Sequence, residues 1–159
     1  MVESVAEYSK LLAKKFNADE EICEISAWLH DIKKIKEQKE NHHIHGAEEA
    51  EEILNKLNYP KNKIEKVKHC ILTHSSDKKY MPESKEAKIV ACADALSHFD
   101  NFPALAYVVY NLKQHSIEEG REWILKKYQS CWDKLDLIPE TKDIALPKYE
   151  AIKLILEKK

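Results

Sequence analysis

The chain carries histidines and aspartates in segments that otherwise read as apolar helix. The stretch AWLHDIKKIK at 27–36 contains the adjacent pair His30 and Asp31, and IVACADAL places Asp94 among small apolar residues. An unpaired carboxylate in apolar surroundings loses several kcal/mol of solvation or takes up a proton. A bound cation removes that cost, and imidazole and carboxylate are ordinary metal ligands. These residues therefore indicate a divalent metal site.

Further histidines can complete such a site. Ile64, Val67, Ile71 and His74 follow a helical 3-4-3 spacing, so His74 continues a buried stripe. The adjacent pair His42–His43 lies just ahead of a predicted helix, where the first backbone N–H groups would face an anion. The plain alternatives are a hydrogen-bonded core histidine for His74 and a solvated loop for the pair, and both stay open at this point.

Lys34 admits two interpretations. It lies three residues after Asp31, on the same helical face, so the two can form an ordinary ion pair while His30 makes a core contact. Because Lys34 also follows His30 by four residues, it can instead reach a substrate phosphate as a point charge.

The periodicity of apolar residues predicts an all-α fold. We expect a single-domain bundle of about eight helices without a strand, and a polar loop at 37–46. The last helix is expected to begin near Pro147, since proline suits a first helical turn. The expected helices cover 2–16, 19–36, 46–57, 61–74, 84–99, 103–113, 117–135 and 147–158.

Composition narrows the class of protein. The chain has 159 residues, two glycines and a formal net charge of −2, which suits one compact cytoplasmic domain with no expected nucleic-acid or membrane partner. The four cysteines form no CxxC pair and suit reduced, packed thiols. We expect one domain over 1–159, with chemistry in 1–101 and helices of 102–159 packing on it. A homodimer surface is the alternative role for that last third.

In the order in which its motifs occur, the sequence resembles the HD-domain phosphohydrolase superfamily. HD at 30–31 is followed by HHIHGAEEAEEIL, HCILTHSS and ACADAL, and the resemblance runs over about 2–101. It implies a helical bundle around a divalent metal, and hydrolysis of phosphate esters or anhydrides. The implied metal ligands are His30, Asp31, His74, Asp94 and either His42 or His43.

The resemblance also implies how such a site works. One or two metal ions would be bound, and the mixture of imidazole and carboxylate suits Mn, Fe, Co, Ni or Zn better than Mg. Asp31 would position a metal-activated water, and Lys34 would offset charge on the phosphate. The expected substrate is a nucleotide or another small phosphate ester.

One implied ligand is not found. Members of the superfamily usually carry a histidine on the first helix, but VESVAEYSKLLA aligns so that this position falls at Met1 or just before it, and no histidine precedes His30. Either the protein starts upstream, or the site has lost a ligand that a water or a loop histidine replaces. The second case favours a non-catalytic HD-like binding module.

Overall fold

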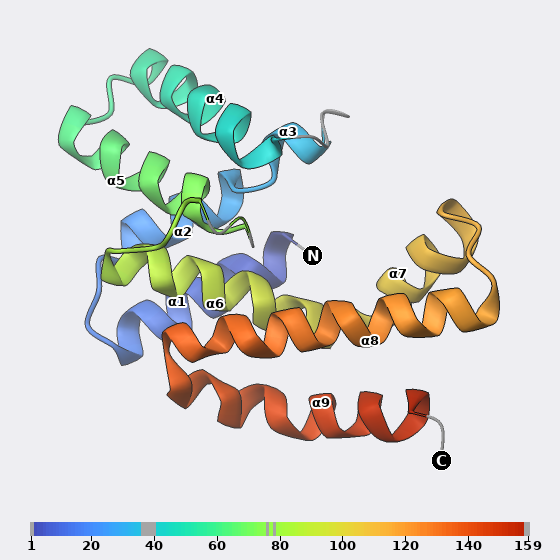
Figure 1. Ribbon diagram of the computed structural model, residues 1–159. Helices are drawn as coiled ribbons and strands as arrows, with labels where there is room; N and C mark the ends of the chain where they lie inside the picture. The colour runs from blue at the N-terminus through green and yellow to red at the C-terminus, as the bar shows by residue number, and fades with distance from the viewer. Residues whose placement is uncertain (1, 36–40, 76, 78, 158–159) are drawn as a thin grey trace. The chain divides into compact units, whose positions relative to one another are not determined.

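The computed structural model describes residues 2–35, 41–75, 77 and 79–157, and within these ranges the chain is helical without a strand (Figure 1). Eight of its α-helices have six residues or more, and the four-residue α3 is a single turn. The predicted all-α fold of about eight helices is therefore confirmed. None of the described helices combines the length and the apolar character that crossing a membrane requires.

Backbone contacts divide the chain into two units, one from Val2 to Asp94 and one from Ala95 onward. This division falls inside α6 (Lys85–Asp100), seven residues before the boundary at 101 that the motifs indicate. Whether the chain acts as one domain stays a prediction, so each unit is described by itself.

The N-terminal unit contains two helical pairs that are joined where α2 packs on α5. α1 packs on α2, α2 packs on α5, and α4 packs on α5. The core between them is apolar and fully buried, and includes Val5, Leu12, Ile22, Val67 and Ile71. The unit comprises α1 (Val2–Lys15), α2 (Glu20–Leu29), α3 (Ile32–Ile35), α4 (His42–Lys56), α5 (Lys61–Thr73) and the first ten residues of α6.

Local sequence explains where these helices start and stop. Asp19 caps α2, because its side chain accepts a hydrogen bond of 3.2 Å from the backbone N–H of Ile22. Asn17 and Asn58 follow α1 and α4 with φ of 52° and 54°, the left-handed conformation that asparagine tolerates at a helix end. Each helix thus turns back after few residues and packs against its neighbour.

Two boundaries near the candidate site were predicted wrongly. The helix expected over 19–36 stops at Leu29, and α3 begins only at Ile32. Neighbouring residues of an α-helix point about 100° apart. The break between the two helices lets the side chains of His30 and Asp31 converge. The segment expected as a loop is helical from His42 onward, four residues earlier than predicted. The rest of that expected loop, 37–40, lies outside the described residues.

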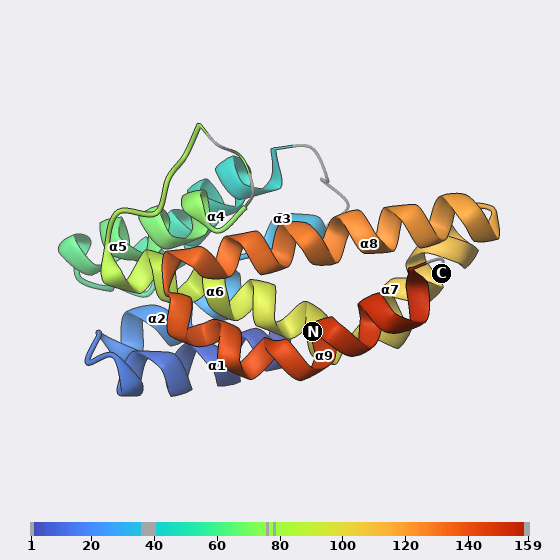
Figure 2. The ribbon, with the colours of Figure 1, turned by 60° about the horizontal axis from the view of Figure 1, so that its bottom comes forward.

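The C-terminal unit is built on α8 and α9, which pack against each other and run side by side in both ribbon views (Figure 2). A capping box at Ser116 and Glu119 starts α8. Besides the end of α6, the unit contains α7 (Phe102–Tyr107), the π-helix η1 (Val108–Leu112), α8 (Ile117–Lys134), the 3₁₀ turns η2 (Leu135–Leu137) and η3 (Pro139–Thr141), and α9 (Lys142–Leu156).

The start of the last helix was also predicted wrongly. α9 begins at Lys142, and Pro147 lies inside it rather than in a first turn before a separate helix. Proline removes one backbone hydrogen bond there. Ala145, Tyr149 and Ile152 are nevertheless buried along the helix, and this burial offsets the loss.

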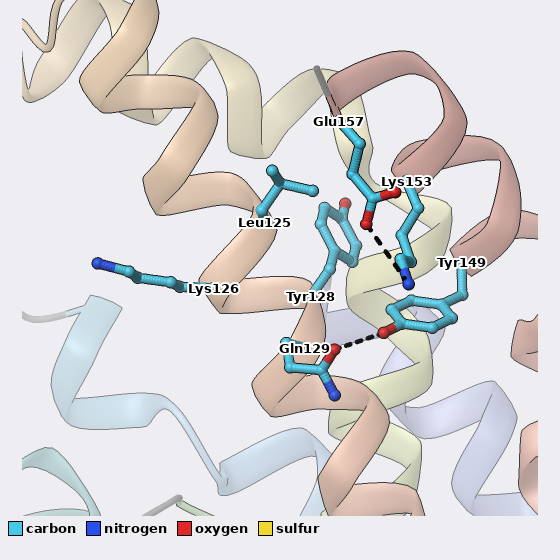
Figure 3. A pocket seen from close by; sticks show the side chains of 7 residues that line it. All are labelled: Leu125, Lys126, Tyr128, Gln129, Tyr149, Lys153 and Glu157. Atoms are coloured by element: carbon cyan, nitrogen blue, oxygen red, sulfur yellow. Dashed lines mark hydrogen bonds and ion pairs between the residues drawn. The ribbon is translucent and has the colours of Figure 1, made fainter. Parts of the chain in front are cut away.

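Aromatic packing around Trp132 stabilises the C-terminal unit. The Trp132 ring stacks on Tyr149 with centroids 4.4 Å apart, and Tyr128 donates a hydrogen bond of 2.8 Å to the His98 carbonyl. Beside them is a cavity of about 250 Å³ whose polar side chains pair with one another: Tyr149 donates to Gln129 Oε1, and Lys153 meets Glu157 (Figure 3). The cavity is lined by Leu125, Lys126, Tyr128, Gln129, Tyr149, Lys153 and Glu157.

Candidate metal centre

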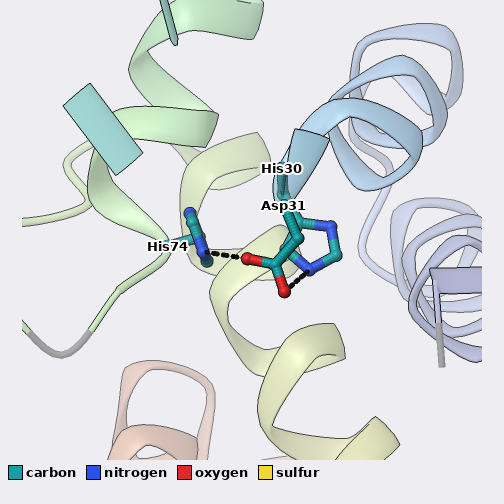
Figure 4. Close-up of side chains that lie close together, drawn as sticks. All are labelled: His30, Asp31 and His74. Atoms are coloured by element: carbon teal, nitrogen blue, oxygen red, sulfur yellow. Dashed lines mark ion pairs between the residues drawn. The ribbon is translucent and has the colours of Figure 1, made fainter. Parts of the chain in front are cut away.

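Two helix ends bring the first three candidate residues together. His30 is the C-cap of α2 and Asp31 follows it, while His74 is the C-cap of α5. Since α2 and α5 pack together, the ends of these helices place the two imidazoles on opposite sides of the Asp31 carboxylate (Figure 4). His30 and His74 are each 2% exposed and Asp31 is 8% exposed, so the cluster is nearly cut off from solvent.

The orientation of both imidazoles is fixed by backbone carbonyls. His30 Nδ1 lies 2.6 Å from the Ala27 carbonyl oxygen, and His74 Nδ1 lies 2.6 Å from that of Ile71. A carbonyl oxygen only accepts hydrogen bonds, so the hydrogen-bond network assigns the proton of each neutral ring to Nδ1. Nε2 then carries a lone pair directed at the cluster, which is how metal-binding histidines are usually held.

The Asp31 carboxylate meets these nitrogens without forming hydrogen bonds. Its Oδ1 lies 3.6 Å from His74 Nε2 and 3.6 Å from His42 Nε2, and its Oδ2 lies 3.5 Å from His30 Nε2. Within the described ranges, Oδ1 is buried and has no hydrogen-bond partner. When their rings are neutral, His30 and His74 therefore turn Nε2 lone pairs toward this carboxylate, and a cation between them removes the repulsion.

Asp94 adds a second carboxylate to the same place. It lies on α6, its side chain is 13% exposed, and its Oδ1 is 3.8 Å from His30 Nε2. Segments from α2, α5 and α6 therefore converge on one region, as the sequence predicts for His30, Asp31, His74 and Asp94.

The structure separates the two histidines that the sequence leaves equivalent. His42 Nε2 faces Asp31, and the His42 ring lies 5.4 Å from that of His74. His43, the next residue of α4, instead turns its Nε2 to within 3.5 Å of Asp77 Oδ2. His42 is thus placed among the candidate ligands, whereas His43 lies beside them.

Both interpretations of Lys34 find support in the geometry. Its ammonium lies 3.1 Å from Asp31 Oδ2, as an ordinary ion pair requires. The Lys34 side chain is also 46% exposed, so the ammonium lies where a ligand can reach it from solvent. The ion pair and a contact with substrate phosphate are compatible, because Asp31 has a second oxygen.

The charges of the cluster keep Asp31 ionised. Burial raises the pKa of Asp31, but His74, His30 and Lys34 outweigh burial and hold this pKa well below its usual range. The lowering by His74 and His30 acts only while their rings are protonated. Burial lowers the pKa of His30, against the nearby carboxylates of Asp94 and Asp31 that raise it. An ionised carboxylate beside neutral imidazoles is the protonation state in which these groups bind metal.

These residues fit a divalent metal ion. One donor atom each from His30, Asp31 and His74 lie within 4.8 Å of one another, and all three residues are buried. The unpartnered Asp31 Oδ1 and the carbonyl-held imidazoles supply the carboxylate and nitrogen donors that transition metals and zinc prefer.

Two residues beside the site escaped prediction from sequence. Asp77 pairs with His43, and the Tyr80 ring lies 5.6 Å from the His43 ring. Both belong to a polar segment between α5 and α6 without periodicity, so no sequence signal placed them near the histidines. His45 lies apart from the cluster, exposed and paired with Glu48, as expected for a structural histidine.

Comparison with known proteins agrees with this geometry. The family model described as "HD domain" matches residues 2–98, more than half of the chain and all of the candidate ligands. The chain belongs to the HD domain family. Membership accounts for the order of the ligand segments, because the pair at His30–Asp31 and the later Asp94 both fall within the match.

Two known proteins are similar to this chain. A tRNA (cytidine(56)-2′-O)-methyltransferase from Thermoplasma volcanium is 32% identical over 138 residues, which are 80% of this chain but only 40% of that protein. The chain therefore spans less than half the length of this curated relative. A predicted HD superfamily hydrolase from an uncultured Thermotogales bacterium has a similar fold, with a TM-score of 0.58 and 21% identity over 93% of this chain and 79% of that one.

Proposed function

We propose that this HD domain is a metal-dependent phosphohydrolase acting on a nucleotide or another small phosphate ester. The observation that carries the proposal is the Asp31 carboxylate, whose buried oxygen faces the Nε2 atoms of His42 and His74 at 3.6 Å each without a hydrogen bond. A cation at this point would satisfy the buried Asp31 oxygen. The printed description of the Thermotogales protein as a predicted hydrolase supports the same reaction class.

In this proposal His30, Asp31, His74 and Asp94 hold the metal, and His42 adds a fifth ligand or serves a second ion. When bound, a divalent metal supplies an acidified water and withdraws charge from phosphoryl oxygens. Mn, Fe, Co, Ni or Zn suits this donor set better than Mg. His43 faces Asp77, so we propose it as a ligand only if the second ion is shared with that carboxylate.

The remaining chemistry belongs to the side chains. Asp31 Oδ1 can accept a hydrogen bond from the attacking water and so orient the lone pair of that water toward phosphorus. Lys34, partly exposed beside Asp31, can donate to a phosphoryl oxygen and offset the charge that accumulates in the transition state. The mechanism requires no serine or cysteine nucleophile.

The test is phosphate release after controlled metal loading. Chelator-treated protein is reloaded with each candidate metal and assayed on nucleoside monophosphates and sugar phosphates. Asp94→Asn should lower kcat/KM by about 100-fold or more, as expected when a metal-site ligand is lost. The matched control is Asp100→Asn, an aspartate at the end of the same helix that pairs with Lys148, and it should retain activity. Hydrolysis that needs no metal, or that survives Asp94→Asn, would contradict the proposal.

A second candidate is a binding module without turnover. One observation favours it: the curated relative is described by an activity on tRNA. In this case the cluster would bind a phosphate group of a nucleotide or an RNA without hydrolysing it. Metal-dependent binding of nucleotide or tRNA, with no phosphate released under any metal, would support this candidate. A cytoplasmic location and a homodimer stay expectations from the sequence.

A further inference from the structure

We infer that Tyr80 is the stacking surface for the base of a nucleotide whose phosphate lies at the candidate metal centre. The inference rests on the proposed function, and it narrows the substrate class from small phosphate esters to nucleoside phosphates. It starts from the ring contact that joins the α5–α6 segment to the start of α4.

Tyr80 is placed at the right distance from the ligands. Its ring centroid lies 5.6 Å from that of His43, and the His43 centroid lies 5.6 Å from that of His42. The Tyr80 ring is therefore no more than about 11 Å from the imidazole that faces Asp31. A ribose and its ester oxygen bridge a span of this kind, with the phosphate at one end and the base at the other.

The half-buried Tyr80 ring meets an exposed lysine side chain. The exposed side chain of Lys79 reaches over the ring, with its ammonium 5.3 Å from the centroid. A group that arrives from solvent can therefore lie on the ring face that Lys79 covers, and a cation–π contact of an exposed lysine is weak enough to be exchanged for a base. Every nucleobase has a π-face, so such a surface accepts different bases.

The buried His43 contacts the Tyr80 ring. His43 is 6% exposed, meets Tyr80 at an interplanar angle of 63°, and is itself held by Asp77 at 3.5 Å. The pair His43–Asp77 thus helps to fix the orientation of the Tyr80 ring. This arrangement gives His43 and Asp77 a positioning role that metal binding does not require of them.

The experiment compares substrates with and without a base in Tyr80 variants. For nucleoside 5′-monophosphates, Tyr80→Leu should raise KM by about tenfold while kcat changes little, because stacking on an aromatic side chain is lost but apolar volume against His43 is kept. Tyr80→Phe should behave like the natural protein. KM for ribose 5-phosphate, which has no base, should be the same in all three, and Met81→Ala, an exposed neighbour, is the matched control.

Binding separates this inference from the proposed function. A nucleoside 5′-phosphonate, which resists hydrolysis, is titrated by calorimetry into metal-loaded protein. If Tyr80→Leu weakens its binding about tenfold while no substrate is hydrolysed, the stacking role stands and the phosphohydrolase proposal fails. Equal effects of Tyr80→Leu on base-bearing and base-free ligands, or no effect on either, would overturn the stacking role whatever the protein hydrolyses.

Discussion

Asp31→Asn should stabilise the metal-free protein and destabilise the metal-bound protein relative to the natural sequence. Asparagine has nearly the same shape, but its amide donates hydrogen bonds, so it can pair with the Nε2 lone pair that a neutral His74 turns toward Asp31 Oδ1. The substitution also removes the ion pair with Lys34, and the two effects have opposite signs.

The magnitudes of these two effects decide whether Asp31→Asn raises or lowers the stability of the metal-free protein. A buried unsatisfied acceptor costs about 1–3 kcal/mol, and each new hydrogen bond contributes about 0.5–1.5 kcal/mol. Because the Lys34 side chain is 46% exposed, its ion pair is worth only about 0.2–1 kcal/mol. The free energy of unfolding of the metal-free variant should therefore exceed that of the natural protein by roughly 1–2 kcal/mol.

Bound metal should make the natural protein more stable than the Asp31→Asn variant. At a metal concentration 100 times Kd the natural protein gains about 2.7 kcal/mol, whereas a variant that binds 100-fold more weakly gains about 0.4 kcal/mol. The natural protein should then be the more stable of the two by roughly 1 kcal/mol.

The assay is urea unfolding followed by circular dichroism at about pH 8, where ordinary imidazoles are neutral, with chelator and with each metal. Lys34→Gln is the control, because it removes the ion pair and leaves the carboxylate among the imidazoles. A variant less stable than the natural protein under both conditions would show that Asp31 serves only as the partner of Lys34, and the metal account would be refuted.

Three further outcomes follow from the structure. The free energy of unfolding of metal-free protein should fall as pH drops below about 6.5. The loss is at most about 1.4 kcal/mol per pH unit for each histidine whose pKa is lowered by folding. Burial lowers the pKa of His30 in the folded protein, so the unfolded chain takes up the proton first as pH falls. Urea unfolding from pH 8 to 5 should show this loss of stability, and His30→Gln should make the loss smaller. Gly120→Ala should destabilise the C-terminal unit by about 1–3 kcal/mol, because its methyl would overlap the Tyr110 ring; adding Tyr110→Ala should restore part of the loss in thermal unfolding. All four cysteines are free and buried, and burial raises the pKa of Cys70 to about 12, so a disulfide reagent should label them only on unfolding; rapid labelling of native protein would contradict this packing.

Much of the fold follows from the spacing of apolar residues. The stripe on α5 was predicted because each member lies three or four residues from the next, and it placed His74 inward at the end of that helix. Helix starts with a side-chain cap, such as Asp19, were also found to within one residue, because the capping residue stands out in the sequence.

The missed boundaries lie where tertiary contacts override local preference. The break after Leu29 has no glycine or proline to mark it, and it reflects the convergence of His30 and Asp31 on one cluster. The start of α4 was missed because the three histidines at 42, 43 and 45 resemble a polar loop, although His43 is buried there. Pro147 was misplaced because the burial of α9 against α8 tolerates a proline that local rules put at the helix start.

The convergence of the candidate ligands could be predicted from the sequence, but its geometric detail could not. Spacing alone cannot say which of His42 and His43 turns toward Asp31, since either ring can be rotated about its own side-chain bonds. The approach of Tyr80 to His43 depends on the path of the segment between α5 and α6, which has no periodic pattern to predict it.

Anomalous scattering from a crystal of the manganese- or zinc-loaded protein tests the central claim most directly. The account predicts a difference peak at about 2.0–2.3 Å from Nε2 of both His30 and His74 and from a carboxylate oxygen of Asp31, with Asp94 also coordinating. A fully loaded crystal with its peak elsewhere, or with these Nε2 atoms hydrogen-bonded to Asp31 and no metal between them, would contradict it.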